Sequence, residues 1–132
     1  MLQKIVVSLA IALFAIAGCT TKADQLKALY TQSIAANETC AAALEKAATP
    51  EEVAAAITAW GEESARIAAA QKQLQKTDPV KPDEEQFKKM MDAMQKQGKA
   101  LVATLQKKEF LNNKTILDAY AKAAQKVADA SK

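Results

Sequence analysis

Residues 49–76 read TPEEVAAAITAWGEESARIAAAQKQLQK, and this stretch decides the fold class. Thr49 suits the N-cap of a helix, Pro50 its first position, and Glu52 completes a capping box three residues after the cap. The positions that follow alternate spacings of four and three, which places them on one side of a helix. These stripe positions are Val53, Ile57, Trp60, Ser64, Ile67, Gln71 and Leu74. The stretch therefore predicts an amphipathic helix, with Trp60 buried.

The same spacing extends toward the N-terminus, over residues 23–47. Asp24 suits the start of this segment, where an acid interacts favourably with the helix dipole. The stripe positions are Leu26, Tyr30, Ser33, Asn37, Cys40, Leu44 and Ala47. A second amphipathic helix is therefore predicted before Thr49.

Two further helices are predicted after residue 76. The run Thr77-Asp78-Pro79-Val80-Lys81-Pro82 predicts a loop, because proline ends a helix and biases the residue before it toward extended backbone. Asp83 is the predicted N-cap of a helix that continues to about Lys108, and Asn112 or Asn113 that of a last helix. The stripe positions of the third helix are Phe87, Met91, Met94, Gly98, Leu101 and Leu105. Those of the fourth are Ile116, Leu117, Tyr120, Ala124 and Val127.

Helices with one apolar stripe must bury that stripe against one another, and short connections favour antiparallel neighbours. The frequent alanines favour helix as well. We therefore predict an all-α fold, an antiparallel up-down-up-down four-helix bundle. The alternative is a set of long helical hairpins that completes its core by dimerisation.

The first residues predict an export signal. Lys4 is the only charge before Lys22, and residues 5–17 read IVVSLAIALFAIA. This apolar run is too short to span a bilayer, which needs about 20 residues. A positive start followed by a short apolar segment is typical of a secretory signal peptide.

Ile16-Ala17-Gly18-Cys19, at the end of that run, resembles the lipobox of bacterial lipoproteins. The resemblance implies cleavage before Cys19 and lipidation of its thiol. The predicted organisation is a signal peptide at 1–18, a lipidated tether at 19–22 and a helical domain at 23–132. The residue after the cysteine is Thr20 rather than an aspartate. The resemblance therefore implies an outer-membrane anchor facing the periplasm. In a host without an outer membrane, the outer face of the plasma membrane is expected.

Composition excludes several functions. The sequence has no histidine, so Ser-His-Asp catalysis and histidine-ligated haem or zinc sites are excluded. Loss of Lys4 leaves 17 of the 18 basic residues beside 15 acidic ones, a net charge of +2 that gives no reason to expect nucleic acid as a partner. The lysines of residues 88–126 are interleaved with acids, which favours a salt-bridged surface over lipid binding. We predict no enzyme activity, no metal and no cofactor.

Two sets of sulfur residues are candidate sites. Cys40 is the only cysteine besides Cys19 and lies on a predicted stripe. It is either a small buried hydrophobic residue or the source of an intermolecular disulfide. Thioethers at Met90, Met91 and Met94 could bind Cu(I) or haem, but the position of the last two on the stripe beside Phe87 favours core packing. The neighbouring acids Glu62–Glu63 and Glu84–Glu85 diverge by about 100° on a helix and predict no carboxylate pair.

The order and lengths of the predicted helices, with the proline-containing link before the third, also resemble the cytochrome b562 bundle. That family holds haem between a methionine in the first helix and a histidine in the last. Leu26 and Leu29 occupy the first region here, and histidine is absent. The resemblance implies the bundle without the haem. The predicted function is a non-enzymatic envelope module that binds an envelope protein or cell-wall component, with homodimerisation as a further expectation. An immunity or exclusion protein and a ligand-carrying bundle are the alternatives.

Overall fold

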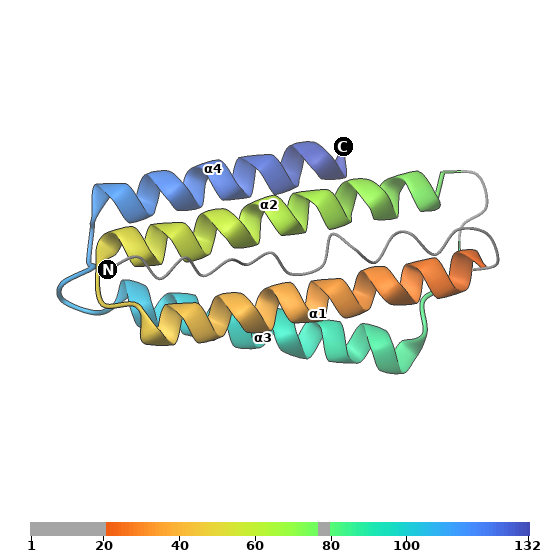
Figure 1. Cartoon of the computed structure of the whole chain (residues 1–132), viewed down its shortest axis with the longest axis horizontal. Helices are drawn as coiled ribbons and strands as arrows, with labels where there is room; N and C mark the ends of the chain where they lie inside the picture. Colours follow the sequence, from red (N-terminus) through yellow and green to blue (C-terminus); the bar gives the residue numbers. More distant parts are fainter. Residues whose placement is uncertain (1–20, 77–79) are drawn as a thin grey trace, which may run out of the picture.

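The computed structural model describes residues 21–76 and 80–132. They form helices α1 (Lys22–Lys46), α2 (Pro50–Leu74), α3 (Glu84–Leu105) and α4 (Lys114–Ser131) (Figure 1). This part of the chain contains no strand. The predicted all-α, four-helix fold is confirmed, and each helix begins within a few residues of its predicted start.

Side-chain caps fix where the helices begin. The backbone N–H of Glu52 donates to Thr49 Oγ1 at 3.2 Å, and the Glu52 carboxylate accepts from the N–H of Ala48 at 2.7 Å. The predicted caps Asp83 and Asn113 are confirmed by bonds of 2.9 and 3.2 Å from the N–H three residues later. Helix α1 is capped by Thr21, which accepts from the N–H of Asp24 at 3.2 Å. These bonds satisfy N–H groups that the first helical turn leaves without a partner.

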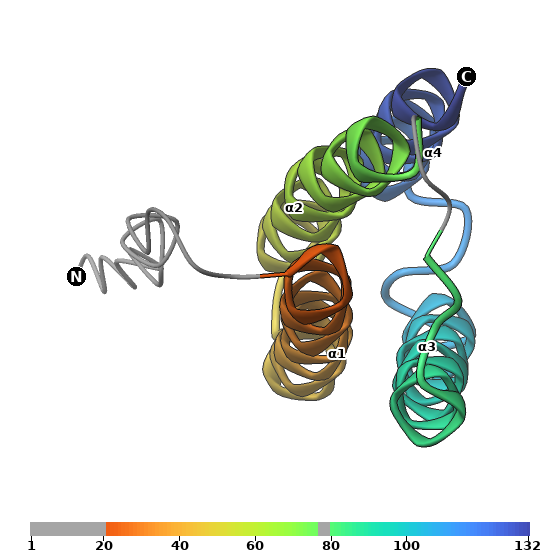
Figure 2. The ribbon, with the colours of Figure 1, turned by 90° about the vertical axis from the view of Figure 1, so that its right-hand side faces the viewer.

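The helices pack in an order that differs from their order in the chain. Helix α1 contacts α2 and α3, and α2 also contacts α4. Among the described residues, α3 makes no close backbone contact with α2 or α4. Figure 2 shows the resulting arrangement end on: α3 and α4 are the two ends of the row α3–α1–α2–α4, and both lie on the same side of the α1–α2 pair. The bundle is therefore open between α3 and α4.

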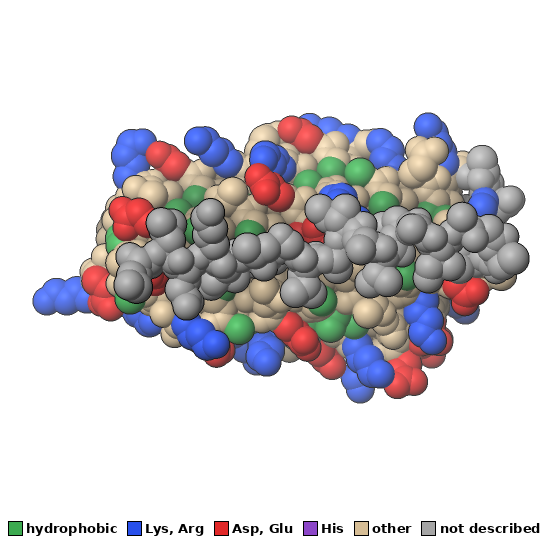
Figure 3. Space-filling model, in the orientation of Figure 1, with side chains coloured by type: hydrophobic (Ala, Val, Ile, Leu, Met, Phe, Trp, Pro, Cys, Tyr) green, Lys and Arg blue, Asp and Glu red, His purple; other side chains and the backbone are tan. Residues whose placement is uncertain are grey.

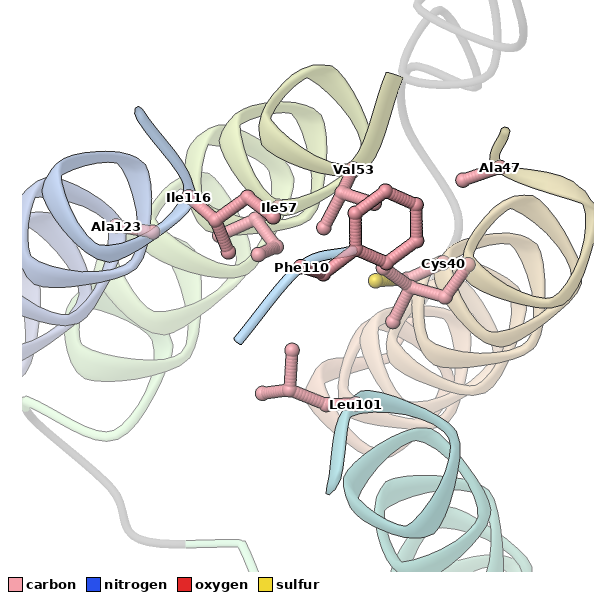
Figure 4. Close-up of a cluster of buried hydrophobic side chains, with 9 residues drawn as sticks. Cys40, Ala47, Val53, Ile57, Leu101, Phe110, Ile116 and Ala123 are labelled. Atoms are coloured by element: carbon pink, nitrogen blue, oxygen red, sulfur yellow. The ribbon is translucent and has the colours of Figure 1, made fainter. Parts of the chain in front are cut away.

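A cluster of buried hydrophobic side chains includes Ala47 and Phe110, from the connections 47–49 and 106–113. Phe110, from the second connection, is 2% exposed, and its ring lies between Val53 and Cys40 (Figure 4). Leu44, Val53, Ile57 and Ile116 around it are at most 1% exposed. Burial of apolar side chains is the main favourable contribution to folding, so Phe110 stabilises the closed end of the molecule.

The stripes predicted for the first two helices largely form the core. Leu26, Tyr30, Cys40 and Leu44 of α1 are buried, as are Val53, Ile57 and Ile67 of α2. Trp60 is partly buried rather than enclosed, and its indole N–H donates to Asn37 Oδ1 at 3.1 Å. Asn37 is only 4% exposed, so this bond satisfies a buried amide that would otherwise be costly.

Gly61 explains the close packing of α2 on α4. A Cβ atom added at Gly61 would lie 2.5 Å from the Cβ of Ala123 and 2.8 Å from its Cα. Both contacts are shorter than van der Waals separation, and one of them is to backbone. The two helices can approach this closely only because position 61 has no side chain.

Candidate functional site

Of the stripe predicted for the third helix, Leu101 is buried as predicted, but the prediction of core packing for Met91 and Met94 is wrong. Met91, Met94 and their neighbour Phe87 are 47%, 46% and 43% exposed. The buried row consists of Ala93, Gln97, Leu101 and Thr104. Helix α3 therefore packs on α1 through a smaller and more polar row than the pattern predicted.

Helix α4 departs from its predicted stripe in the same way. Ile116 is fully buried as predicted, but Leu117 and Tyr120 are 49% and 43% exposed. Ala123 is the other buried residue of this helix, where it contacts α2. Helix α4 thus has a wide apolar arc, and α2 covers only part of it.

Six large apolar side chains of α3 and α4 are thus exposed, and we call them the exposed apolar face. Its members are Phe87, Met91, Met94, Val102, Leu117 and Tyr120. Met94, Val102 and Leu117 each follow a buried residue by one position, which turns them about 100° from the buried row. Helices α3 and α4 run in opposite directions (Figure 1) and flank the same opening (Figure 2), so the same turn directs both stripes toward that opening. The exposed apolar face therefore lines that opening.

Cys40 is a buried free thiol, as one of the two readings predicted. It is 3% exposed, and Gln97 Nε2 donates to its sulfur at 3.7 Å. Burial raises the pKa of the thiol, and the bond from Gln97 opposes this only in part. A thiol held in the neutral form is a poor nucleophile, so Cys40 is suited to packing.

The charged residues form ion pairs over the surface. Arg66 Nε donates to Glu63 at 3.1 Å, and this bond raises the pKa of the guanidinium. Glu62 pairs instead with Lys126 of α4 at 3.4 Å. Figure 3 shows basic and acidic side chains interspersed on the face of the molecule in view. Among the described residues, no cluster of three or more histidine, cysteine, aspartate or glutamate side chains could hold a metal ion.

Two hollows of about 350 and 320 Å³ lie beside Leu26 and Tyr30, at the end of the molecule away from Phe110. Tyr30 also packs edge-on against Phe87, with ring centroids 6.4 Å apart. Lysine, glutamine and aspartate side chains line much of both hollows. The apolar surface of the site is therefore the face along α3 and α4 and not an enclosed cavity.

Cys19 and the rest of the predicted signal segment lie outside the described residues. Within residues 21–76 and 80–132, no helix combines the length and the apolar character needed to cross a membrane. No family model, curated protein or solved structure matches the chain. The exposed apolar face is the feature on which a function can be argued.

Proposed function

We propose that this chain is a non-enzymatic, lipid-anchored envelope protein that binds a helical protein segment through its exposed apolar face. The observation that carries the proposal is the exposure of six large apolar side chains, between 43% and 54% each, along α3 and α4, the two helices that flank the opening. A large side chain has roughly 150–250 Å² of surface, the range for aromatic residues. Six such side chains, each about half exposed, together expose on the order of 500 Å². A patch of this size on a small domain is typical of an interaction surface.

A helix fits this face better than a small ligand does. The face follows α3 from Phe87 to Val102, which corresponds to about 22 Å of helix at 1.5 Å per residue. Apolar side chains on two helices that flank an opening can contact the apolar side of a third helix, a common mode of peptide recognition. Methionines at its centre suit such a surface because their side chains adapt to the shape of a partner.

The proposed location rests on the first residues. The lipobox resemblance at Cys19 and the short apolar segment before it support export and lipidation, and Thr20 supports the outer membrane. Two or three acyl chains give a stable anchor, since each buried methylene contributes about 0.8 kcal/mol.

The anchor is tested by labelling cells with an alkyne fatty acid. The wild-type chain is expected to take up label and sediment with membranes. Cys19→Ser is expected to lose the label and leave the membrane fraction. Absence of label on the wild-type protein would refute the anchor.

The binding face is tested by co-purification from detergent-solubilised envelopes. The double variant Met91→Gln and Met94→Gln is expected to lose its bound protein, whether that is another protein or a differently tagged copy. The double variant Lys88→Gln and Lys96→Gln changes exposed residues of the same helix and is expected to retain it. Equal retention by both variants would show that the exposed apolar face is not the binding surface.

A further inference from the structure

We propose that the helical segment bound by the exposed apolar face belongs to a second copy of this chain. In the resulting homodimer, α3 of each copy packs against α4 of the other. The inference rests on the proposed function, because it names the partner of the same surface. Three features of the described residues support it: the size of the face, the glycine within it and the complementary shapes of α3 and α4.

The size of the face matches what a stable dimer requires. A standard interface buries about 800 Å² per partner. Homodimer interfaces are about 65% apolar, so such an interface needs on the order of 500 Å² of apolar surface from each copy. The exposed apolar face supplies that amount, and the charged and polar side chains beside it supply a rim.

Gly98 lies among these side chains, between Met94 and Val102. A glycine inside a helix costs about 0.5–1 kcal/mol relative to alanine, so it calls for a reason. At Gly61 the reason is the backbone of α4, which leaves no room for a Cβ. At Gly98 no atom lies within 4 Å of an added Cβ. A helix of a second copy could pack against Gly98 as closely as α4 packs against Gly61. The lack of a side chain at position 98 would then permit that contact.

The two helices also have complementary shapes. Helix α3 offers the long side chains Phe87, Met91 and Met94. Beside Leu117 and Tyr120, helix α4 offers exposed small residues, namely Ala121, Ala124 and Ala128. Long side chains can occupy the space above alanines, and a twofold axis repeats the contact so that each copy supplies both halves. This pairing is isologous, so it closes as a dimer and does not propagate.

Contacts within one copy hold α3 away from its own α4. Gln86 Nε2 donates to Thr31 Oγ1 at 2.8 Å, which joins α3 to α1. Gln97 donates to the buried sulfur of Cys40, and Phe87 packs on Tyr30. Moving α3 onto its own α4 would break all three contacts, whereas a second copy covers the face without breaking any.

Photo-crosslinking of the full-length chain in its bacterial envelope tests the dimer. A benzophenone amino acid replaces Met94 on the exposed apolar face or, as a matched control, Lys96, which lies about 200° further round the same helix. Two differently tagged copies are expressed together. The Met94 probe is expected to give an adduct that carries both tags, and the Lys96 probe is not. Gly98→Leu should abolish the adduct, because its side chain fills the space for the second helix.

The outcomes separate the dimer from the function on which it rests. A Met94 adduct with a different protein overturns the dimer but leaves the proposed function standing. A Met94 adduct with lipid overturns both the dimer and the proposed function. No adduct at Met94 overturns both. An adduct that persists in Gly98→Leu overturns the packing of a helix over Gly98. Since nothing lies within 4 Å of the Gly98 position, the variant should remain folded, which circular dichroism verifies.

Discussion

Helices α2 and α3 each carry one glycine near the middle, and the two glycines have different surroundings. Gly61 faces the backbone of Ala123 at a distance that admits no side chain, and the α2–α4 contact around it is buried. Gly98 faces open space in a row of side chains that are about half exposed. The first glycine is explained by this one chain, and the second is not. The difference indicates that the α2–α4 contact is complete within the chain, whereas α3 retains surface for another molecule.

The largest difference between the two regions is expected when one phenylalanine of each is replaced by alanine. Phe110 is 2% exposed in the core, and Phe87 is 43% exposed on the exposed apolar face. Phe110→Ala is expected to lower the free energy of unfolding by about 3–5 kcal/mol, because it leaves a cavity where the connections meet. Phe87→Ala should cost much less in a dilute sample, where no partner covers it. Urea denaturation followed by circular dichroism measures both, and equal losses would contradict the distinction between the two regions.

Replacing each of the two glycines by alanine is expected to change the free energy of unfolding by a smaller amount, and in opposite directions. Gly61→Ala is expected to destabilise the protein by about 1–2 kcal/mol, since overpacking against Ala123 exceeds the gain in helix propensity. Gly98→Ala should stabilise the dissociated chain by about 0.5–1 kcal/mol, because the gain meets no clash. Thermal melts at low protein concentration provide the comparison. Destabilisation by Gly98→Ala would show that position 98 is already occupied within one copy.

The third test measures the reactivity of thiols on the two surfaces, and its variants are expected to change stability least. In a Cys19→Ser background Cys40 is the only thiol, and it should resist a water-soluble alkylating reagent until urea unfolds the protein. A second thiol introduced as Met94→Cys should react at once in a dilute sample, where no second copy covers position 94. Rapid labelling of native Cys40 would contradict its burial.

The raised pKa of Cys40 adds a pH dependence to this test. Since burial favours the neutral thiol, its contribution to stability is complete below the pKa of the unfolded thiol, near 9.0, and is lost as the pH rises toward the higher pKa of the folded state. The melting temperature is therefore expected to fall above about pH 9 more steeply in the wild type than in Cys40→Ala. Parallel curves would show that the thiol titrates alike in both states.

Local signals predicted the helices well. Thr49, Asp83 and Asn113 cap helices because their side chains lie within three residues of free N–H groups, an interaction that depends only on neighbouring sequence. The cap at Thr21 has the same geometry, but the apolar spacing predicted a segment that begins at residue 23, two residues after this cap. Phe110 was missed for another reason, because it lies in a connection where no periodicity marks a buried residue.

Helix pairing was harder to predict, and the errors on α3 and α4 have one cause. Periodicity shows that a helix has an apolar side but not which neighbour covers it. Helix α3 carries a large apolar row through Met91 and Met94 and a modest row through Ala93 and Gln97, and α1 covers the modest one. The sequence pattern gave preference to the larger side chains. The exposed apolar face thus became apparent only when the helices were placed together.

The cap at Thr21 has a consequence for the proposed lipid anchor, because it limits how far the domain could stand from a membrane. If Cys19 carries the acyl chains, only Thr20 separates it from the residue that caps α1. An extended chain spans at most about 3.6 Å per residue, so Cys19 and Thr21 lie within about 8 Å of each other. The domain would then sit directly on the lipid headgroups, with α1 rising no more than about 38 Å above them at 1.5 Å per residue. With such an anchor, its reach would be set by the length of its own helices, and a partner would have to come to the membrane surface to meet it.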